Sequence, residues 1–256
     1  MRVFFVVLAR DTENLQAKIK ELDRLGYPYL VVCGEKTNLP NVAYREPKGK
    51  YDAINYGMKL VPAETEIVAF NDVDTVIHNF DVALKMLHGS VVSLVYAKVQ
   101  VEKGPQQSFY SFLDKLRDRM PLAASGELML VWYNMLKQVL PLKGCKAEDS
   151  YILFSLLEKG AKAVFCKDCY VTTKRTSRAD EEEQYKRRTV GGIYQALSMT
   201  KPPKTVKFFY ILLPLLSPLL LLSGKKGYYW TKGILLGYID YIRGDKTASW
   251  KRTYNN

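Results

Sequence analysis

The chain has 256 residues, of which 48% are apolar, and its 38 basic against 26 acidic residues give a net charge of +12. This length allows one large domain with an appendage and excludes two full-sized domains. The charge suggests an anionic partner such as nucleic acid, a nucleotide or a lipid surface. Ten Lys or Arg and two Asp lie in residues 201–256, so +8 of the +12 belongs to the C-terminal fifth of the chain.

Strand-like and helical patterns alternate at the start of the chain. The apolar run Val3–Ala9 predicts a core strand, because it is too short for a membrane span and lacks a signal-peptide cleavage pattern. A helix capped at Asp11 or Thr12 should follow and end at Gly26. Further strands and a helix are expected at 29–32, 42–45, 53–60 and 66–70. This order predicts a mostly parallel sheet with helices on both faces, and ligands beyond the carboxyl ends of its strands.

The elements after residue 90 are less regular. A strand is expected at 91–101, helices at 109–120 and 128–140, an amphipathic helix at 147–160, a strand from 161, and a helix that ends near Met199. Cys166 and Cys169 form a C-x-x-C, but no second pair stands at zinc spacing, so we interpret them as buried thiols. On a strand, an offset of three sends side chains to opposite faces.

The C-terminal region differs from the rest of the chain in its long apolar segments flanked by lysines. Residues 208–222 contain no charge and are flanked by lysines on both sides, and a second apolar segment follows at 233–242. A helix of that length falls short of the hydrocarbon core of a bilayer, and Pro214 and Pro218 would kink it. We expect a helical hairpin that dips into one leaflet or barely crosses, with lysines on lipid phosphates. The alternative is a buried apolar helix of a soluble domain.

Two aspartates follow the expected strand at 66–70. Asp72 and Asp74 are two residues apart, so on an extended segment both side chains point to the same side. A pair of carboxylates suits Mg²⁺ or Mn²⁺ with a diphosphate completing the coordination shell. Taken alone, the pair is explained more simply as turn residues that end a strand.

Two further pairs of residues can also be interpreted either as functional groups or as ordinary structural residues. Gly49 and Lys50 lie in a loop before a helix, where a lysine and free backbone amides can hold phosphate oxygens, although such loops are also ordinary turns. Glu148 and Asp149 open an apolar helix, where acids are favoured as caps as well as for catalysis. Neither pair alone decides between the two interpretations.

The order of these motifs is more specific than any of them. G-K-x-x-A-x-N-x-G at 49–57, D-x-D at 72–74, S-G at 125–126, E-D at 148–149 and Q-x-x-R at 184–187 together resemble the family 2 glycosyltransferases. The likeness extends from Val3 to about Leu197 and is to cellulose-synthase-like and lipid-linked-glycan mannosyltransferase members. It implies an α/β GT-A fold, with a catalytic domain at 1–183, an interfacial helix at 184–204 and a membrane hairpin and tail at 205–256.

The resemblance also implies residue roles. Asp72 and Asp74 match the metal-binding and diphosphate-binding pair, Asp149 the general base, and Ser125 and Gly126 the sugar pocket. Donor contacts are implied for Lys50, Gln184 and Arg187. Nucleotide contacts are also expected from Glu35, as a substitute for a family aspartate, and from Arg10, which follows the first strand. The chain departs from the family pattern at Arg188, which stands where processive synthases have tryptophan, and at Cys33–Lys36, which replaces D-D-x-S.

The function implied is transfer of a hexose, with inversion and one sugar per encounter, from a nucleotide sugar to a lipid-linked acceptor. GDP-mannose is the favoured donor and UDP-glucose the next, with Mn²⁺ or Mg²⁺ as cofactor and the catalytic domain on the cytoplasmic face of a membrane. Two enzymatic alternatives stay open: a polysaccharide synthase that uses UDP-glucose, and a haloacid-dehalogenase-like phosphohydrolase with Asp72 as nucleophile. A basic protein that binds nucleic acid is disfavoured, because most of the charge flanks apolar helices.

Overall fold

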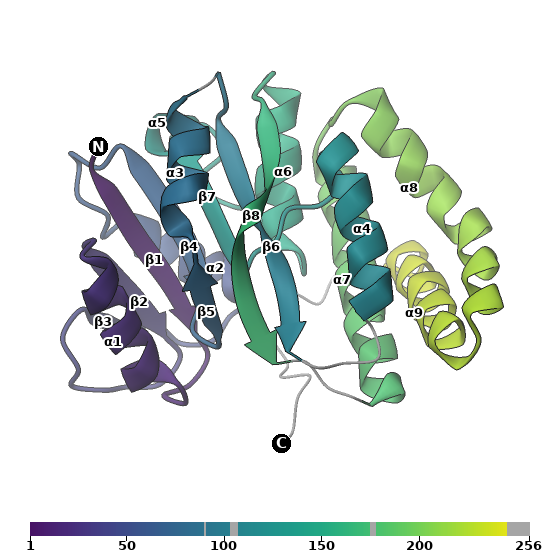
Figure 1. The fold of residues 1–256 in the computed structure, drawn as a ribbon, viewed down its shortest axis with the longest axis horizontal. Helices are drawn as coiled ribbons and strands as arrows, with labels where there is room; N and C mark the ends of the chain where they lie inside the picture. The colour runs from purple at the N-terminus through teal and green to yellow at the C-terminus, as the bar shows by residue number, and fades with distance from the viewer. Residues whose placement is uncertain (90, 103–106, 175–177, 245–256) are drawn as a thin grey trace.

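One eight-stranded sheet forms the centre of the molecule (Figure 1). The computed structural model describes residues 1–256 except 90, 103–106, 175–177 and 245–256. The strands are β1 (Val3–Ala9), β2 (Tyr29–Cys33), β3 (Val42–Tyr44), β4 (Ile67–Asp72), β5 (Thr75–His78), β6 (Leu94–Glu102), β7 (Leu128–Trp132) and β8 (Ala163–Lys174).

Helices cover both faces of this sheet and extend beyond one end of it (Figure 1). They are α1 (Leu15–Leu25), α2 (Lys50–Met58), α3 (Phe80–His88), α4 (Gln107–Arg119), α5 (Tyr133–Lys137), α6 (Glu148–Glu158), α7 (Ala179–Met199), α8 (Lys204–Leu216), the 3₁₀ helix η1 (Ser217–Ser223) and α9 (Lys225–Ile242).

The strand order is β3-β2-β1-β4-β7-β6-β8-β5. The first four strands in this order are parallel, β7 runs antiparallel to both of its neighbours, β6 and β8 are parallel, and β5 closes the edge antiparallel to β8. The predicted mostly parallel, mixed α/β sheet is therefore confirmed. Leu8 is opposite Asp72 and Ala9 is opposite Cys33, so β1, β2 and β4 end at the same edge.

Every residue of β1 is buried, because the two faces of the sheet carry separate apolar cores. Phe4, Val6 and Leu8 pack with side chains of α2, α5, α6 and α7, whereas the alternate residues of β1 pack with α1 and α3. A strand that is buried on both faces reads as a continuous apolar run, as the sequence of β1 does.

Two local predictions are wrong. The helix expected at 128–140 is instead β7 followed by the short helix α5, because the apolar run Leu128–Trp132 fills the position between β4 and β6. Cys166 and Cys169 were expected on opposite faces, yet both are buried in the same core, because the register of β6 and β8 shifts between Ala97 and Lys98. The interpretation of both cysteines as buried thiols is confirmed.

The C-terminal helices form a layer against α7. An added Cβ on Gly237 of α9 would lie 2.5 Å from the carbonyl oxygen of Arg187, so α7 and α9 are in close backbone contact. The expected boundary between residues 183 and 184 falls inside α7. Within the described residues, Lys204–Ser223 is the one segment whose length and hydropathy would allow a membrane span, with a mean hydropathy of 1.9.

Candidate active site

The candidate site lies where β4 ends. Asp72 is the last residue of β4, Val73 and Asp74 form a turn, and Thr75 begins β5. The Thr75 hydroxyl donates a hydrogen bond of 2.9 Å to the carbonyl oxygen of Asp72, and the backbone N–H of Val73 donates to the carbonyl oxygen of Leu8. Asp72 is half-buried and Asp74 is exposed, so the turn presents one sheltered and one accessible carboxylate.

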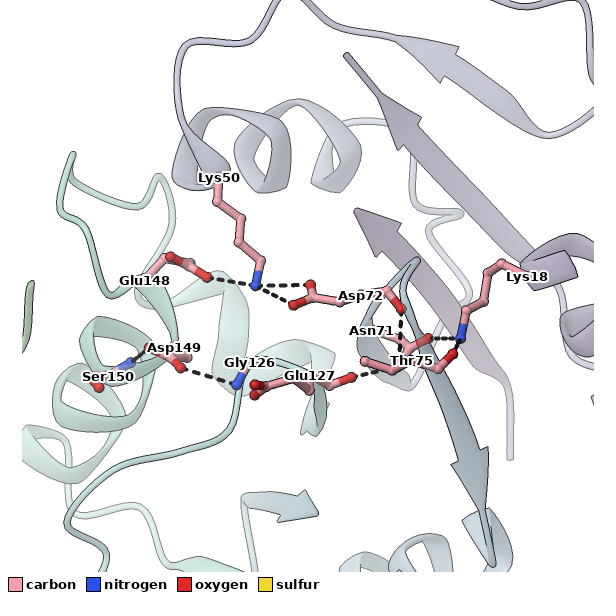
Figure 2. Close-up of polar contacts among 10 residues, drawn as sticks. All are labelled: Lys18, Lys50, Asn71, Asp72, Thr75, Gly126, Glu127, Glu148, Asp149 and Ser150. Atoms are coloured by element: carbon pink, nitrogen blue, oxygen red, sulfur yellow. Dashed lines mark hydrogen bonds and ion pairs between the residues drawn. The ribbon is translucent and has the colours of Figure 1, made fainter. Parts of the chain in front are cut away.

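Lys50 joins the D-x-D to the E-D motif. Its Nζ lies 2.9 Å and 3.0 Å from the two carboxylate oxygens of Asp72, and 3.0 Å from Oε1 of Glu148 (Figure 2). Lys50 is the first residue of α2, and Gly49 before it has φ 127, a conformation that glycine adopts readily. Motifs far apart in the sequence thus meet at one ammonium group.

The charge of Lys50 is secured by its surroundings. Burial lowers the pKa of this lysine, but the carboxylates of Asp72, Glu148 and Asp149 outweigh burial and raise the pKa well above its ordinary value. Burial in turn raises the pKa of Asp72, and Lys50 opposes that rise. The site therefore holds a permanent positive charge next to carboxylates whose ionisation depends on it.

Asp149 is the second residue of α6 and lies beside this cluster. Its Oδ2 accepts a hydrogen bond of 3.1 Å from the backbone N–H of Gly126, and its Oδ1 accepts one of 2.6 Å from the N–H of Ser150 (Figure 2). Burial first, then Glu148, raises the pKa of Asp149 to about 6, so the group is still mainly ionised at neutral pH. A carboxylate in this state can accept a proton.

Gly126 lies between the two charged groups. An added Cβ there would be 3.2 Å from both the Asp149 carboxylate and Lys50 Nζ, so a side chain would crowd them. Ser125, in contrast, is buried, and its hydroxyl donates a hydrogen bond of 2.5 Å to the carbonyl oxygen of Ala97 on β6. Ser125 thus anchors the loop, whereas Gly126 keeps space beside the carboxylates.

Other residues of the G-K-x-x-A-x-N-x-G motif have packing roles. The Asn55 side chain donates to the carbonyl oxygen of Leu142 at 2.9 Å and accepts from its N–H at 2.7 Å, which clamps the segment before α6. An added Cβ on Gly57 would come within 3.0 Å of Val6 and Val32, so α2 lies close against β1 and β2. Both contacts fix the position of Lys50 relative to Glu148.

Arg10 and Glu35 lie after β1 and β2, at the sheet edge where β4 also ends. The Glu35 carboxylate accepts hydrogen bonds from the N–H and hydroxyl of Thr12, at 3.1 Å and 3.0 Å. An added Cβ on Gly34 would come 2.3 Å from the carbonyl oxygen of Arg10, so these two loops are in contact. The structure brings both residues to the expected edge, and their contact with a nucleotide stays a prediction.

Gln184 and Arg187 lie on the exposed side of α7. The guanidinium of Arg187 binds the carboxylate of Asp240 on α9 through two hydrogen bonds of 2.6 Å and 2.7 Å. This arginine therefore ties α7 to α9 in the structure. Its expected role in holding a diphosphate stays a prediction.

The donor set at the turn fits a divalent metal shared with a substrate. Among the described residues, no group of three or more His, Cys, Asp or Glu could enclose an ion alone. Mg²⁺ and Mn²⁺ are usually bound by one or two carboxylates together with substrate phosphates, which Asp72 and Asp74 could provide. Oδ1 of Asp72 is buried and faces Lys50 Nζ without hydrogen-bond geometry, so it retains capacity for a cation.

Sequence reasoning missed Lys18, Asn71 and Glu127. Asn71 is fully buried and its amide donates to the carbonyl oxygen of Glu127 at 2.5 Å. Lys18 is buried although it occupies a helix whose other lysine, Lys20, is exposed. Asn71 could have been noticed as the single amide within an apolar strand, and Lys18 as a charged residue at a core position of α1, three residues after Leu15 and four before Leu22.

Comparisons with known proteins identify the fold. No family model matches the chain, and no curated protein matches its sequence. A solved mannosyltransferase, PcManGT from Pyrobaculum calidifontis, described in complex with GDP-Man and Mn²⁺, is similar with a TM-score of 0.71 at 16% identity, covering 96% of this chain and 88% of its own. GalNAc-T7, described with UDP, GalNAc and Mn²⁺, is similar with a TM-score of 0.56 at 11% identity, covering 95% of this chain and 56% of its own. The chain has the GT-A glycosyltransferase fold.

Proposed function

We propose that the protein is a metal-dependent inverting glycosyltransferase that moves a hexose from a nucleotide sugar to a lipid-linked acceptor. The observation that carries the proposal is the cluster in which Lys50 joins Asp72 to Glu148. This cluster stands at the carboxyl end of β4, where open α/β sheets bind their ligands. The GT-A fold adds independent support.

The cluster provides the charges that sugar transfer needs. Negative charge develops on the nucleoside diphosphate as it leaves, and the Lys50 ammonium offsets that charge. A Mn²⁺ or Mg²⁺ bound to Asp72 and Asp74 would supply further positive charge to the same diphosphate. Asp149 accepts the proton of the acceptor hydroxyl, whose oxygen attacks the anomeric carbon from the face opposite the nucleotide and so inverts that centre.

The donor and acceptor are assigned with support from outside the site. GDP-mannose is the favoured donor, because a solved structure with the same fold is described with GDP-Man and Mn²⁺, and UDP-glucose is the next candidate. A single transfer per encounter is favoured over polymerisation, because Arg188 replaces the tryptophan of processive enzymes.

A lipid-linked acceptor is favoured by the surface of the C-terminal helices. A line of exposed apolar side chains follows α8 and η1 at a spacing of three or four residues: Phe208, Ile211, Leu215, Leu219 and Leu222. Lysines 204 and 207 precede this line and lysines 225 and 226 follow it. We propose that this surface inserts into one leaflet, with the catalytic domain on the cytoplasmic face.

A panel of sugar nucleotides with Mn²⁺ or Mg²⁺ tests the proposal, with release of nucleoside diphosphate as the readout. Wild-type protein should turn over one of the donors, and Asp74→Ala should lose that metal-dependent turnover. In Asp149→Asn, donor affinity should persist while transfer falls by about 10²- to 10⁴-fold, because the base is lost. Asp168→Asn makes the same chemical change on the exposed surface of β8 and should retain full activity.

Three results would contradict the proposal or a part of it. If no donor is bound or turned over and Asp74→Ala changes nothing, the glycosyltransferase assignment fails. Covalent labelling of Asp72 by a phosphoryl analogue would support the phosphohydrolase alternative instead. If Asp149→Asn abolishes donor binding, Asp149 acts as a helix cap and another group must be the base.

A further inference from the structure

We infer that Lys18 is a positioning residue for the metal-binding turn, and that its three hydrogen-bonding contacts set the direction of the Asp72 and Asp74 carboxylates. This inference rests on the proposed function, since it concerns the same site. It assigns a role to a residue of α1 that belongs to none of the sequence motifs.

Lys18 reaches the turn from the side opposite Lys50 (Figure 2). It is only 2% exposed. Its Nζ donates to Oδ1 of Asn71 at 2.8 Å and to the carbonyl oxygen of Thr75, and lies 2.7 Å from a carboxylate oxygen of Glu21. An ammonium group has three donors, and all three are used here.

Two of these acceptors belong to the residues on either side of the D-x-D motif. Asn71 precedes Asp72, and Thr75 follows Asp74. The Asn71 amide also donates to the Thr75 hydroxyl at 2.9 Å, and that hydroxyl donates to the carbonyl oxygen of Asp72. Lys18 therefore holds both ends of the turn, and the two ends are bonded to each other.

Glu21 extends the same network to β5. One of its carboxylate oxygens accepts a hydrogen bond of 2.5 Å from the backbone N–H of Ile77, while the other pairs with Lys18. One turn of α1 thus contacts the end of β4, the turn and the strand that follows it. A displacement of this helix would be passed directly to the two aspartates.

A purely structural role would not require a lysine. Burial lowers the pKa of Lys18, which means that the charged form is desolvated, and Glu21 opposes that effect. An apolar residue would fill the same space in the core without this cost, as replacements of buried ion pairs have shown. What the lysine adds is three fixed donors directed at one turn.

The test compares Lys18→Met and Lys18→Arg with Lys20→Met, which removes an exposed lysine from the same helix. Mn²⁺ binding in the presence of GDP or UDP is measured by electron paramagnetic resonance, kcat and KM for the donor by nucleoside diphosphate release, and stability by thermal unfolding. Arginine retains the charge that balances Glu21, but its planar fork cannot reproduce the three contacts of an ammonium.

The expected result is that both Lys18 variants bind Mn²⁺ about 10-fold more weakly and have a raised KM, with kcat at saturation nearly unchanged. Lys20→Met should match the wild type.

If Lys18→Met does not fold, the Mn²⁺ affinity of Lys18→Arg tests the inference. Wild-type affinity for Mn²⁺ in a folded Lys18 variant overturns the inference, as does failure of both variants to fold, which would make Lys18 a general stabilising residue. Failure of the wild type to bind Mn²⁺ with either nucleotide would contradict the proposed function itself.

Discussion

Lys50 determines the electrostatic state of the candidate site, because it neutralises carboxylates that arrive from two distant segments. The pairs with Asp72 and Glu148 are short and largely shielded from solvent. Removing one partner of such a group leaves the others uncompensated, which is more costly than the loss of an exposed ion pair. The positive charge of Lys50 also acts on Asp149, but burial is the main cause of the raised pKa of Asp149.

The pH dependence of transfer follows from Asp149. Its pKa is raised to about 6, and a general base is active only when ionised, so kcat at saturating donor and metal should fall as the pH decreases through this value. Initial rates measured between about pH 5 and pH 8 would give the apparent pKa.

Asp149→Asn provides the control for this profile. With donor and metal saturating, its residual rate should lack the step near pH 6, because Asp149 no longer titrates, whereas Asp72, whose pKa burial raises to about 7, is present in both proteins. A wild-type profile that stays flat down to about pH 5 would remove Asp149 from the role of base.

At the scale of elements, the site depends on how closely α7 packs against the start of α6. The start of α6, which carries Glu148 and Asp149, is covered by α7 at Gly192. An added Cβ on Gly192 would lie 2.7 Å from the backbone nitrogen of Ala147 and 2.9 Å from the carbonyl carbon of Lys146. Both neighbours are backbone atoms of the segment that leads into α6, so neither can turn aside as a flexible side chain can.

We therefore expect Gly192→Ala to destabilise the protein by about 1–3 kcal/mol, because α7 must shift away from α6 to accommodate the methyl group. Urea unfolding measures the change in the free energy of unfolding. Thr189→Ala, a small change on the same helix at a half-buried position, should have an effect below about 1 kcal/mol. Equal stability of Gly192→Ala and the wild type would mean that α7 is not held against α6 as described.

The elements were predictable from the sequence where a pattern is local. Val3–Ala9 is apolar throughout and forms β1, and Glu148 and Asp149 open α6 as expected. The run Leu128–Trp132 was misassigned because a short apolar run fits a buried strand and a buried helix equally well. Pairing of Lys50 with Asp72 and Glu148, or of Lys18 with Asn71, was beyond prediction, since these contacts depend on tertiary structure between residues far apart in the chain.

At the scale of the whole molecule, exposed apolar side chains are concentrated on the C-terminal helices. Figure 1 shows α8 along the outer edge, with α9 and α7 nearer the sheet. The exposed line on α8 and η1 includes Leu215 at 73% and Leu222 at 90% exposure, while Val206 and Tyr210 on the same segment are buried. The segment is therefore amphipathic, with one exposed apolar face.

Replacing Leu215 and Leu219 together with glutamate should weaken binding to anionic vesicles at least about 10-fold, because two charges would have to enter the apolar layer. Co-sedimentation with vesicles that contain phosphatidylserine measures this effect. Leu60→Glu, an exposed leucine after α2, is the matched control and should bind as the wild type does. Equal binding of all variants would exclude this face as the lipid contact.

The pairing of β5 with β8 has a consequence for the newly made chain. β5 follows the Asp72–Asp74 turn directly, but its partner residues are Tyr170–Thr173, nearly a hundred residues later. During synthesis, the segment that carries the two aspartates emerges from the ribosome long before the strand that will secure its far side. The proposed capacity to bind a nucleotide should therefore arise only late in translation, after β8 has left the exit tunnel and paired with β5.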